Sequence, residues 1–210
     1  MAIVARVRTP IGAREAAEGL RRAFAALGGQ LSDAMASLLL SQLWLETGRG
    51  KNAFNYNWGN LQASAAWPGD KWPAPWLDLN AVEALPEAAQ RERYRKLHYD
   101  ALAGKQPSYF RAYPTAAAGF GDYAALLNKP RFSPLLYAAA TGDPTAFATQ
   151  IKDTGYAPAI DVTATAKTLA SLQHELLPSV VPVATNVVAG SAALLVAGLA
   201  AAGAAWALTR

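Results

Sequence analysis

The sequence predicts a predominantly helical α+β domain followed by a C-terminal apolar helix. Segments with helical period and clear caps lie before residue 48 and after residue 114. Between them, residues 52–112 are rich in tryptophan and proline and show little helical period. From Leu176 to Thr209 the chain contains no charged residue. These observations place a domain at residues 1–177 and a tail, containing a proline linker, at residues 178–210.

Two helices are expected in the first 50 residues. Apolar side chains at helical spacing predict a helix from about Gly12 to Leu27, which a pair of glycines ends. A serine cap at Ser32 begins a second helix, which runs to Thr47 before two further glycines stop it. Residues 52–112 then indicate loops, short strands and a candidate hairpin, apart from a helical stretch at about Asn80–Arg95.

Four more helices are expected after Pro114. Their caps are Thr115, Ser133, Asp143 and Asp161. Proline directly follows two of these caps, where its fixed φ suits the first turn and its missing N–H has no partner to lose. The last helix reaches Glu175, and Pro178 and Pro182 then separate the domain from the tail.

The stretch Val187–Leu208 has two interpretations. Its 22 residues are all Ala, Gly, Val, Leu, Ser or Trp, and as a helix they would span roughly 33 Å, enough for a bilayer core of about 30 Å. Trp206 and Arg210 suit one membrane interface. Alanine recurs every fourth residue from Ala189 to Ala205, which equally suits close helix packing in an assembly. The sequence therefore predicts a membrane-spanning helix or an assembly helix.

Composition limits the chemistry that the chain can perform. There is no cysteine, and the histidines are His98 and His174. Disulfides, thiol nucleophiles and cysteine-ligated metals are therefore excluded, and we expect no metal and no cofactor. Carboxylates must carry the acid–base chemistry. The net charge of +4 and one basic run, Arg91–Lys96, do not predict a nucleic-acid partner.

Glu46 is the carboxylate whose surroundings suit catalysis. Helical spacing places it on one face with Leu39 and Gln42, at the end of an otherwise apolar stripe, and it is the only acid between Asp33 and Asp70. Apolar surroundings desolvate a carboxylate and raise its pKa, as a general acid at neutral pH requires. The spacing equally fits an exposed glutamate on a helix that is rotated outward.

Three blocks of sequence carry a family resemblance. In chain order they are SQLWLETGRG with NYNWGNLQA, then FRAYPTAAAGFGDYAALL, then DPTAFATQIKDTGYAPAIDVTATA. Together, over about residues 10–175, they resemble the bacterial peptidoglycan glucosaminidase family of flagellar muramidases and autolysins. The resemblance implies a lysozyme-like fold with a small β-lobe, and Glu46 as the general acid. The chain departs from the family at Trp58–Leu61, where Phe-Gly-Ile is common, and in the β-lobe.

The resemblance also implies a second acid in the β-lobe, the least similar region. The candidates are Asp70, Asp78, Glu83, Glu87, Glu92 and Asp100. Asp100 is preferred for its distance upstream of Phe110, and Glu92 comes next, although each candidate also fits a solvated surface charge. Without a second acid, the substrate's acetamido group could take its place, or an anhydro sugar could form as in lytic transglycosylases.

Further site residues are expected from the same resemblance. Tyr156 resembles the family's cleft tyrosine near the acid, where it would orient the sugar or stabilise charge, and it equally fits a core tyrosine. The expected substrate-contacting residues are Tyr56, Asn57, Trp58, Trp72 and Tyr113. Asn57 would bind an acetamido group, and the tryptophans would stack on sugar rings. Trp67 and Trp76 offer the same flat faces for sugar rings, and all four tryptophans equally suit a small core.

The favoured function is a peptidoglycan hydrolase of N-acetylglucosaminidase type that acts on glycan strands at the bacterial cell wall or in the periplasm. The first 20 residues are charged and lack a signal-peptide core. Delivery by a phage virion or another route outside the usual secretory pathway is therefore expected, with the tail as membrane anchor or as contact in a homo-oligomer or virion. Two alternatives stay open: a muramidase or lytic transglycosylase, and a structural or pore-forming glycan-binding component with an inactive lysozyme-like domain.

Overall fold

The central element of the computed structural model, which describes residues 2–105 and 108–181, is helix α2 (Asp33–Glu46). Every residue from Ala36 to Trp44 is buried, because α1 (Ala13–Ala26), α6 (Ser133–Thr141) and α8 (Val162–Val180) pack around it. The helix is therefore buried on all sides over most of its length, rather than along one apolar stripe.

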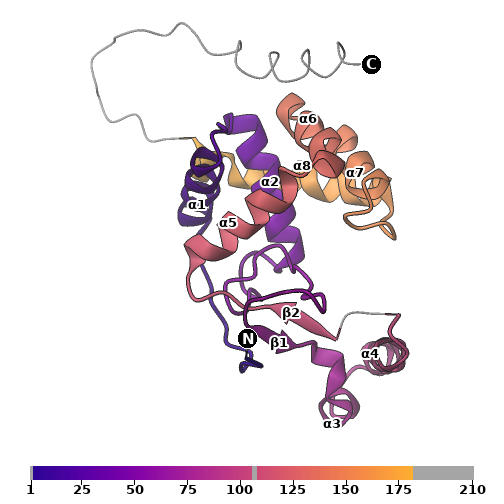
Figure 1. The fold of residues 1–210 in the computed structure, drawn as a ribbon. Coiled ribbons are helices and arrows are strands. Elements are labelled where there is room, and N and C mark those ends of the chain that lie inside the picture. The colour runs from indigo at the N-terminus through magenta and orange to yellow at the C-terminus, as the bar shows by residue number, and fades with distance from the viewer. Residues whose placement is uncertain (1, 106–107, 182–210) are drawn as a thin grey trace, which may run out of the picture.

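The remaining helices complete a helical body around α2 (Figure 1). Helix α5 (Ala116–Leu127) packs against α1, and α7 (Pro144–Asp153) packs against α6 and α8. A short 3-10 turn, η2 (Pro130–Phe132), leads into α6. We call the set of α1, α2 and α5 to α8 the helical body.

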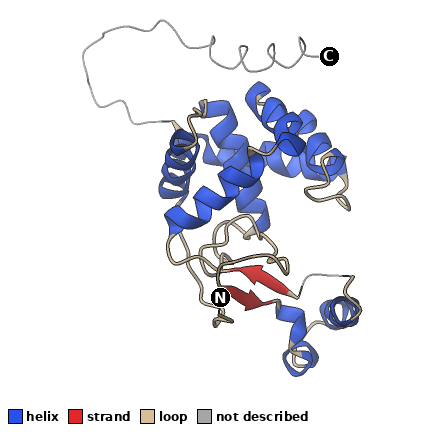
Figure 2. Cartoon of the chain, viewed as in Figure 1, coloured by secondary structure: helices blue, strands red, loops and turns tan. Residues whose placement is uncertain are grey.

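A small lobe lies beside the helical body (Figure 2). Its strands β1 (Lys71–Pro73) and β2 (Tyr109–Arg111) pair antiparallel, with Trp72 opposite Phe110. Trp72, Ala74, Phe110 and Ala112 form its buried core. The lobe is completed by η1 (Pro75–Leu77), α3 (Leu79–Glu83) and α4 (Ala88–Leu102). The two strands are antiparallel, as in the predicted hairpin, but helices connect them instead of a tight turn.

The N-terminal segment, residues 2–9, lies along the small lobe, which the sequence did not indicate. Ile3 forms a parallel bridge with Lys71, and Arg8 forms an antiparallel bridge with Phe54. Between these points, the side chain of Asn55 accepts a hydrogen bond from Val7 N at 2.9 Å and donates one to the carbonyl of Ala5 at 2.9 Å. The segment therefore extends the small sheet and joins it to the loop that follows α2.

The predicted helices are confirmed near both ends of the domain. The side chain of Ser32 accepts a hydrogen bond from Met35 N and begins α2. The predicted caps of α5, α7 and α8 make the same kind of bond; they are Thr115, Asp143 and Asp161. Ser133 is instead the first residue of α6 and makes no side-chain cap.

Two predicted helix bounds were wrong. The helix expected at about Asn80–Arg95 is two helices, since the chain turns at Pro86 between α3 and α4. Helix α8 continues beyond Glu175 and through Pro178 to Val180. Its last turn is held because the Val180 side chain is buried and its carbonyl accepts a hydrogen bond from Arg21 at 3.3 Å.

The described residues include no helix that is both long and apolar enough to cross a membrane. The apolar stretch Val187–Leu208, for which we expected a membrane or assembly helix, lies outside the residues that the structure describes.

Candidate active site

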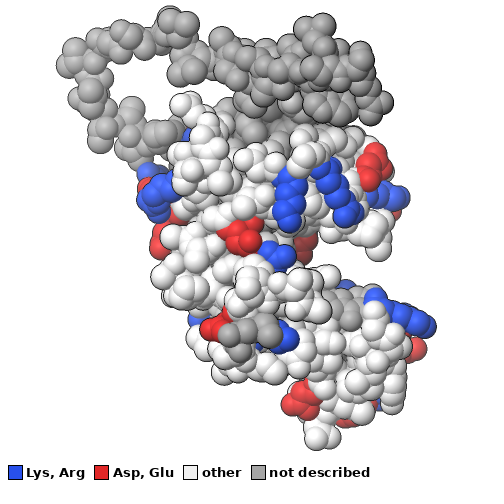
Figure 3. All heavy atoms as spheres, viewed as in Figure 1, with Lys and Arg blue, Asp and Glu red and all other residues white. Residues whose placement is uncertain are grey.

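A cleft of about 740 Å³ lies between the helical body and the small lobe. Figure 3 shows the surface hollowed between these two parts. The helical body contributes Glu46, Phe132 and, after α7, the loop with Tyr156. The small lobe contributes an aromatic wall and two cations, comprising Trp72, Trp76, Phe110, Arg93 and Arg111. The helical body thus supplies the acidic side chain of the cleft, and the small lobe supplies its flat apolar surface.

Glu46 is the last residue of α2, and its carboxylate is partly buried in the wall of the cleft. The side-chain amide of Asn60 donates to Glu46 Oε2 at 3.2 Å and to the Glu46 carbonyl at 3.0 Å. Burial raises the pKa of the Glu46 carboxyl, and the hydrogen bond from Asn60 lowers it by a smaller amount. Among the described residues that line the cleft, Glu46 is the only carboxylate. It can therefore hold and donate a proton at a higher pH than an exposed glutamate.

The turn at Gly59 and Asn60 places that amide against Glu46. Asn60 has a φ of 47°, a left-handed conformation that asparagine adopts more readily than most residues. Gly59 leaves no room for a side chain, because a Cβ there would lie 2.7 Å from the ring of Tyr123 and 3.2 Å from the hydroxyl of Tyr156. The close packing of this turn therefore requires glycine.

Two tyrosines lie close to the acid. The hydroxyl of Tyr156 donates to the Gly59 carbonyl at 3.1 Å, and that of Tyr123 donates to Oε1 of Gln42 at 2.8 Å. Burial raises the pKa of both tyrosines well above its ordinary value, and the charge of Glu46 adds to the shift. Both hydroxyls therefore stay protonated and can donate hydrogen bonds without carrying charge.

The opposite wall is a cluster of stacked aromatic side chains. Trp72 stacks on Phe110 with ring centroids 4.9 Å apart, and Trp76 meets the same phenylalanine edge-on at 5.8 Å. Trp72 Nε1 donates to the Arg111 carbonyl at 3.1 Å. The Arg111 guanidinium pairs with Asp122 of α5 at 2.5 Å, which ties this wall to the helical body. Such flat surfaces suit the apolar faces of sugar rings.

Of the residues predicted for the site, the structure brings Glu46, Trp72 and Tyr156 together in the cleft. Asn57 does not line it. Its amide donates to the carbonyls of Leu61 at 2.8 Å and Arg111 at 3.1 Å, and its oxygen accepts from Leu61 N at 2.7 Å. Because these bonds occupy the side chain, Asn57 holds the loop against β2 and its amide is not free to bind an acetamido group.

Three other predicted contact residues also lie outside the cleft lining. Trp58 is only 1% exposed and stacks on Phe120 inside the helical body. Tyr113 is buried and donates its hydroxyl hydrogen to Asp122. Tyr56 has a left-handed φ of 54°, and its backbone N–H donates to Thr9 Oγ1 at 2.8 Å. These side chains shape the walls without facing the substrate space.

The candidates for a second acid do not line the cleft either. Asp100, the preferred one, is on α4, where its carboxylate accepts a hydrogen bond from Lys96 at 2.6 Å. The others lie on the surface of the small lobe or cap its helices, and they are Asp70, Asp78, Glu83, Glu87 and Glu92. The structure therefore brings no second carboxylate to Glu46 among the described residues.

Sequence reasoning missed Asn60, Arg93 and Arg111 as cleft residues, whereas Trp76, expected either to stack on a sugar or to pack in a small core, lines the cleft. Asn60 carried a signal, because asparagine directly after glycine is typical of left-handed turn positions. Arg93 was expected on a solvated helix face as part of a basic run, but in the structure it lines the cleft. Nothing local in the sequence marked Arg111, since its partner Asp122 belongs to another element.

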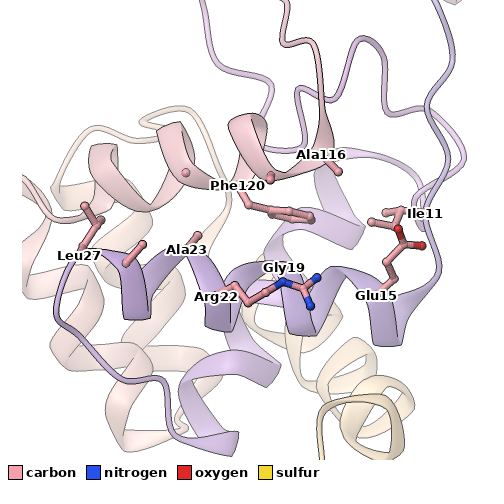
Figure 4. A pocket seen from close by; sticks show the side chains of 11 residues that line it. Ile11, Glu15, Gly19, Arg22, Ala23, Leu27, Ala116 and Phe120 are labelled. Atoms are coloured by element: carbon pink, nitrogen blue, oxygen red, sulfur yellow. The ribbon is translucent and has the colours of Figure 1, made fainter.

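A second hollow, of about 280 Å³, lies between α1 and α5. In Figure 4 the ring of Phe120 lies over Gly19, and small apolar side chains line most of the remaining surface. Its charged side chains, Glu15 and Arg22, both come from α1. Because this hollow lacks the buried acid and neighbouring tyrosine of the cleft, the cleft is the better candidate for an active site.

The sequence of residues 24–177 matches a family model named Glucosaminidase and described as mannosyl-glycoprotein endo-beta-N-acetylglucosaminidase. The chain belongs to the glucosaminidase family. It is therefore a glycoside hydrolase, and the predicted family is confirmed. The match includes Glu46 and Tyr156 and begins after the N-terminal segment.

One solved structure supports the same fold. The chain resembles the peptidoglycan hydrolase from Sphingomonas sp. A1, with a TM-score of 0.50 and 23% identity over 88% of this chain and 96% of that one. It also matches the glycoside hydrolase domain of Salmonella typhimurium FlgJ, with a TM-score of 0.47 and 21% identity over 79% and 89% of the two chains. Curated protein sequences give no match. The first likeness confirms a mostly helical, lysozyme-like fold with a small β-lobe.

Proposed function

We propose that this glucosaminidase-family protein hydrolyses the glycan backbone of peptidoglycan at an N-acetylglucosaminyl linkage. The observation that carries the proposal is the partly buried carboxyl of Glu46, whose pKa is raised and which faces a cleft with an aromatic wall. Family membership supports cleavage of a glycosidic bond. The Sphingomonas relative is a peptidoglycan hydrolase by name, which supports the choice of polymer.

The first chemical step uses Glu46 as general acid. Its proton passes to the glycosidic oxygen as the bond from that oxygen to C1 of the sugar breaks, and positive charge develops at C1. Half-buried Trp76 would hold a sugar ring against the small lobe, with buried Trp72 packed behind the wall. The Tyr156 hydroxyl donates to the Gly59 carbonyl, so its oxygen would accept a hydrogen bond from the sugar. After the step Glu46 is a carboxylate, which the Asn60 amide stabilises.

The developing charge at C1 needs a nucleophile, and the cleft lining offers Glu46 as its only carboxylate among the described residues. The acetamido oxygen of the N-acetylglucosaminyl unit would attack C1, and water would then open the resulting ring with Glu46 as base. If a sugar hydroxyl attacked instead, the product would carry an anhydro end. Mass spectrometry of the products separates these two routes.

The central test is Glu46→Gln assayed on purified peptidoglycan. The glutamine keeps the size of the side chain but has no proton to donate, so the rate should fall about 10²- to 10⁴-fold. New reducing ends and mass spectra of the released fragments measure the cleavage. Glu92→Gln and Asp100→Asn, at acids outside the cleft lining, are the matched controls and should keep near wild-type rates. An inactive wild type would refute the enzyme proposal, and an active Glu46→Gln would refute the role of Glu46.

The proposal includes action at the cell wall, with residues 187–208 as a membrane or assembly helix. Its support is the apolar sequence of the tail. The core of the described domain includes Val180, so a chain ending at residue 181 should fold and retain activity. Flotation with phospholipid vesicles and light scattering, comparing this truncation with the full chain, separate a membrane helix from an oligomerisation helix. A truncation that fails to fold would place the tail within the core.

A further inference from the structure

A groove of about 570 Å³ branches from the catalytic cleft on the side of the small lobe. The two hollows share Asn52, Phe54 and Pro75 in their linings, so they meet at these residues. The branch runs between the N-terminal segment and helices α3 and α4. The cleft with its branch could therefore accommodate a polymer that carries a side group, whereas a linear glycan needs only the cleft.

Two arginines of the N-terminal segment line this branch, Arg6 and Arg8. Both are exposed, and neither forms an ion pair with the acids that the structure describes. The Arg6 guanidinium lies over the ring of Phe54, 4.7 Å from its centroid, at the junction of the two hollows. Asp78, the one acid in the branch lining, accepts a hydrogen bond from Ala81 N as the cap of α3. The branch thus presents positive charge at the point where it leaves the cleft.

The backbone that carries these arginines is held in place. Asn55 bonds to Ala5 and Val7 on either side of Arg6, and Thr9 N donates to the Ala53 carbonyl at 3.0 Å. The two guanidinium groups are therefore presented from a fixed segment. This segment precedes the residues that match the family model, so the two arginines lie outside that match, whereas the other residues that line the branch lie within it.

We infer that the branch binds a carboxylate of the stem peptide attached to the glycan strand in the cleft. The inference rests on the proposed function, because it takes peptidoglycan as the polymer. Stem peptides leave the sugars sideways and carry carboxylates, which match the charge and position of Arg6 and Arg8. Arginine binds carboxylates through paired N–H donors, and stacking on Phe54 leaves the edge of the Arg6 guanidinium free to do so.

The test measures binding separately from cleavage. Catalytically inert Glu46→Gln protein is titrated by calorimetry with three soluble glycan fragments of equal length: one with stem peptides, one with those peptides amidated at their carboxylates, and one without peptides. The same titrations use Arg6→Gln/Arg8→Gln in that background. The control variant is Lys152→Gln/Lys167→Gln. These exposed lysines lie on α7 and α8, so the two substitutions remove the same amount of positive charge far from the branch.

The fragment with free carboxylates should bind about tenfold more tightly than the other two, and Arg6→Gln/Arg8→Gln should abolish this preference while leaving bare glycan binding unchanged. The control variant should keep the preference. Equal binding of all three fragments, or an equal loss for all three in the arginine variant, overturns the inference. Cleavage by the wild-type chain is scored independently, so a preserved preference without hydrolysis would count against the proposed function alone.

Discussion

The helical body and the small lobe differ in how they are held together. The body has a continuous core around α2, whereas the small lobe has a core cluster of four buried residues, two three-residue strands and the added N-terminal segment. The acid comes from the body, at the end of its most buried helix, and the aromatic wall comes from the lobe. Under the proposed function, the body would therefore fix the proton donor and the lobe would determine how the sugar is bound.

Trp72→Ala tests this division where we expect the largest effect. Truncating a buried tryptophan costs about 3–5 kcal/mol, and the small lobe has little other core to compensate. We expect KM to rise at least about tenfold, while the far-UV circular dichroism signal of the helical body persists. Tyr99→Ala is the control, since Tyr99 is an exposed aromatic residue of α4 outside the cleft lining. Cooperative loss of the whole helical signal would show that the two regions fold as one unit.

Gly19→Ala disturbs the body and leaves the lobe intact. An added Cβ would lie 2.5 Å from the buried ring of Phe120, so α1 and α5 must separate. Overpacking of this kind costs about 1–3 kcal/mol, which exceeds or offsets the gain of up to about 1 kcal/mol in helix propensity. Thermal unfolding should shift downward, with activity kept at low temperature. Gly121→Ala, where a Cβ meets nothing within 4 Å, should not lower the midpoint.

Asn60→Gly tests the contact between the cleft turn and the acid, and its effect should be the smallest. Glycine keeps the left-handed backbone and removes the amide that lowers the pKa of Glu46. The general acid works when protonated, so activity should fall as pH rises through the pKa of Glu46. This alkaline limb should move to higher pH in the variant. A limb that stays in place, or moves to lower pH, would contradict the assigned hydrogen bond.

The raised pKa also sets the direction of one contribution to stability. Because folded Glu46 has a pKa above the ordinary value of 4.5, the folded chain binds more protons than the unfolded chain between these two values. The stability that this extra proton binding contributes is fully present below the pKa of Glu46 in the unfolded chain. It is lost as pH rises through the pKa of Glu46 in the folded chain. Denaturant unfolding of Glu46→Gln, followed across this range, should lack that pH-dependent loss.

Much of the fold could be predicted because its signals are local. Ser32, Asp143 and Asp161 cap helices through atoms two or three residues away, so the sequence alone shows these helix starts. The break at Pro86 was missed because helical period continued across it. The continuation of α8 through Pro178 depends on the burial of Val180, which packs against residues distant from it in the sequence.

By itself the sequence limited the class of chemistry: without cysteine and with two histidines, carboxylates were expected to act, and Glu46 stood at the end of an apolar stripe. Only the tertiary structure decided which neighbours face it. The side chain of Asn57 is hydrogen-bonded within its own loop, and Trp58 packs in the apolar core. Asp100 pairs with Lys96, whereas Asn60 forms a hydrogen bond with Glu46. Caps and periodicity act within a few residues, whereas a cleft is made by segments distant in the chain, whose meeting depends on packing of the whole domain.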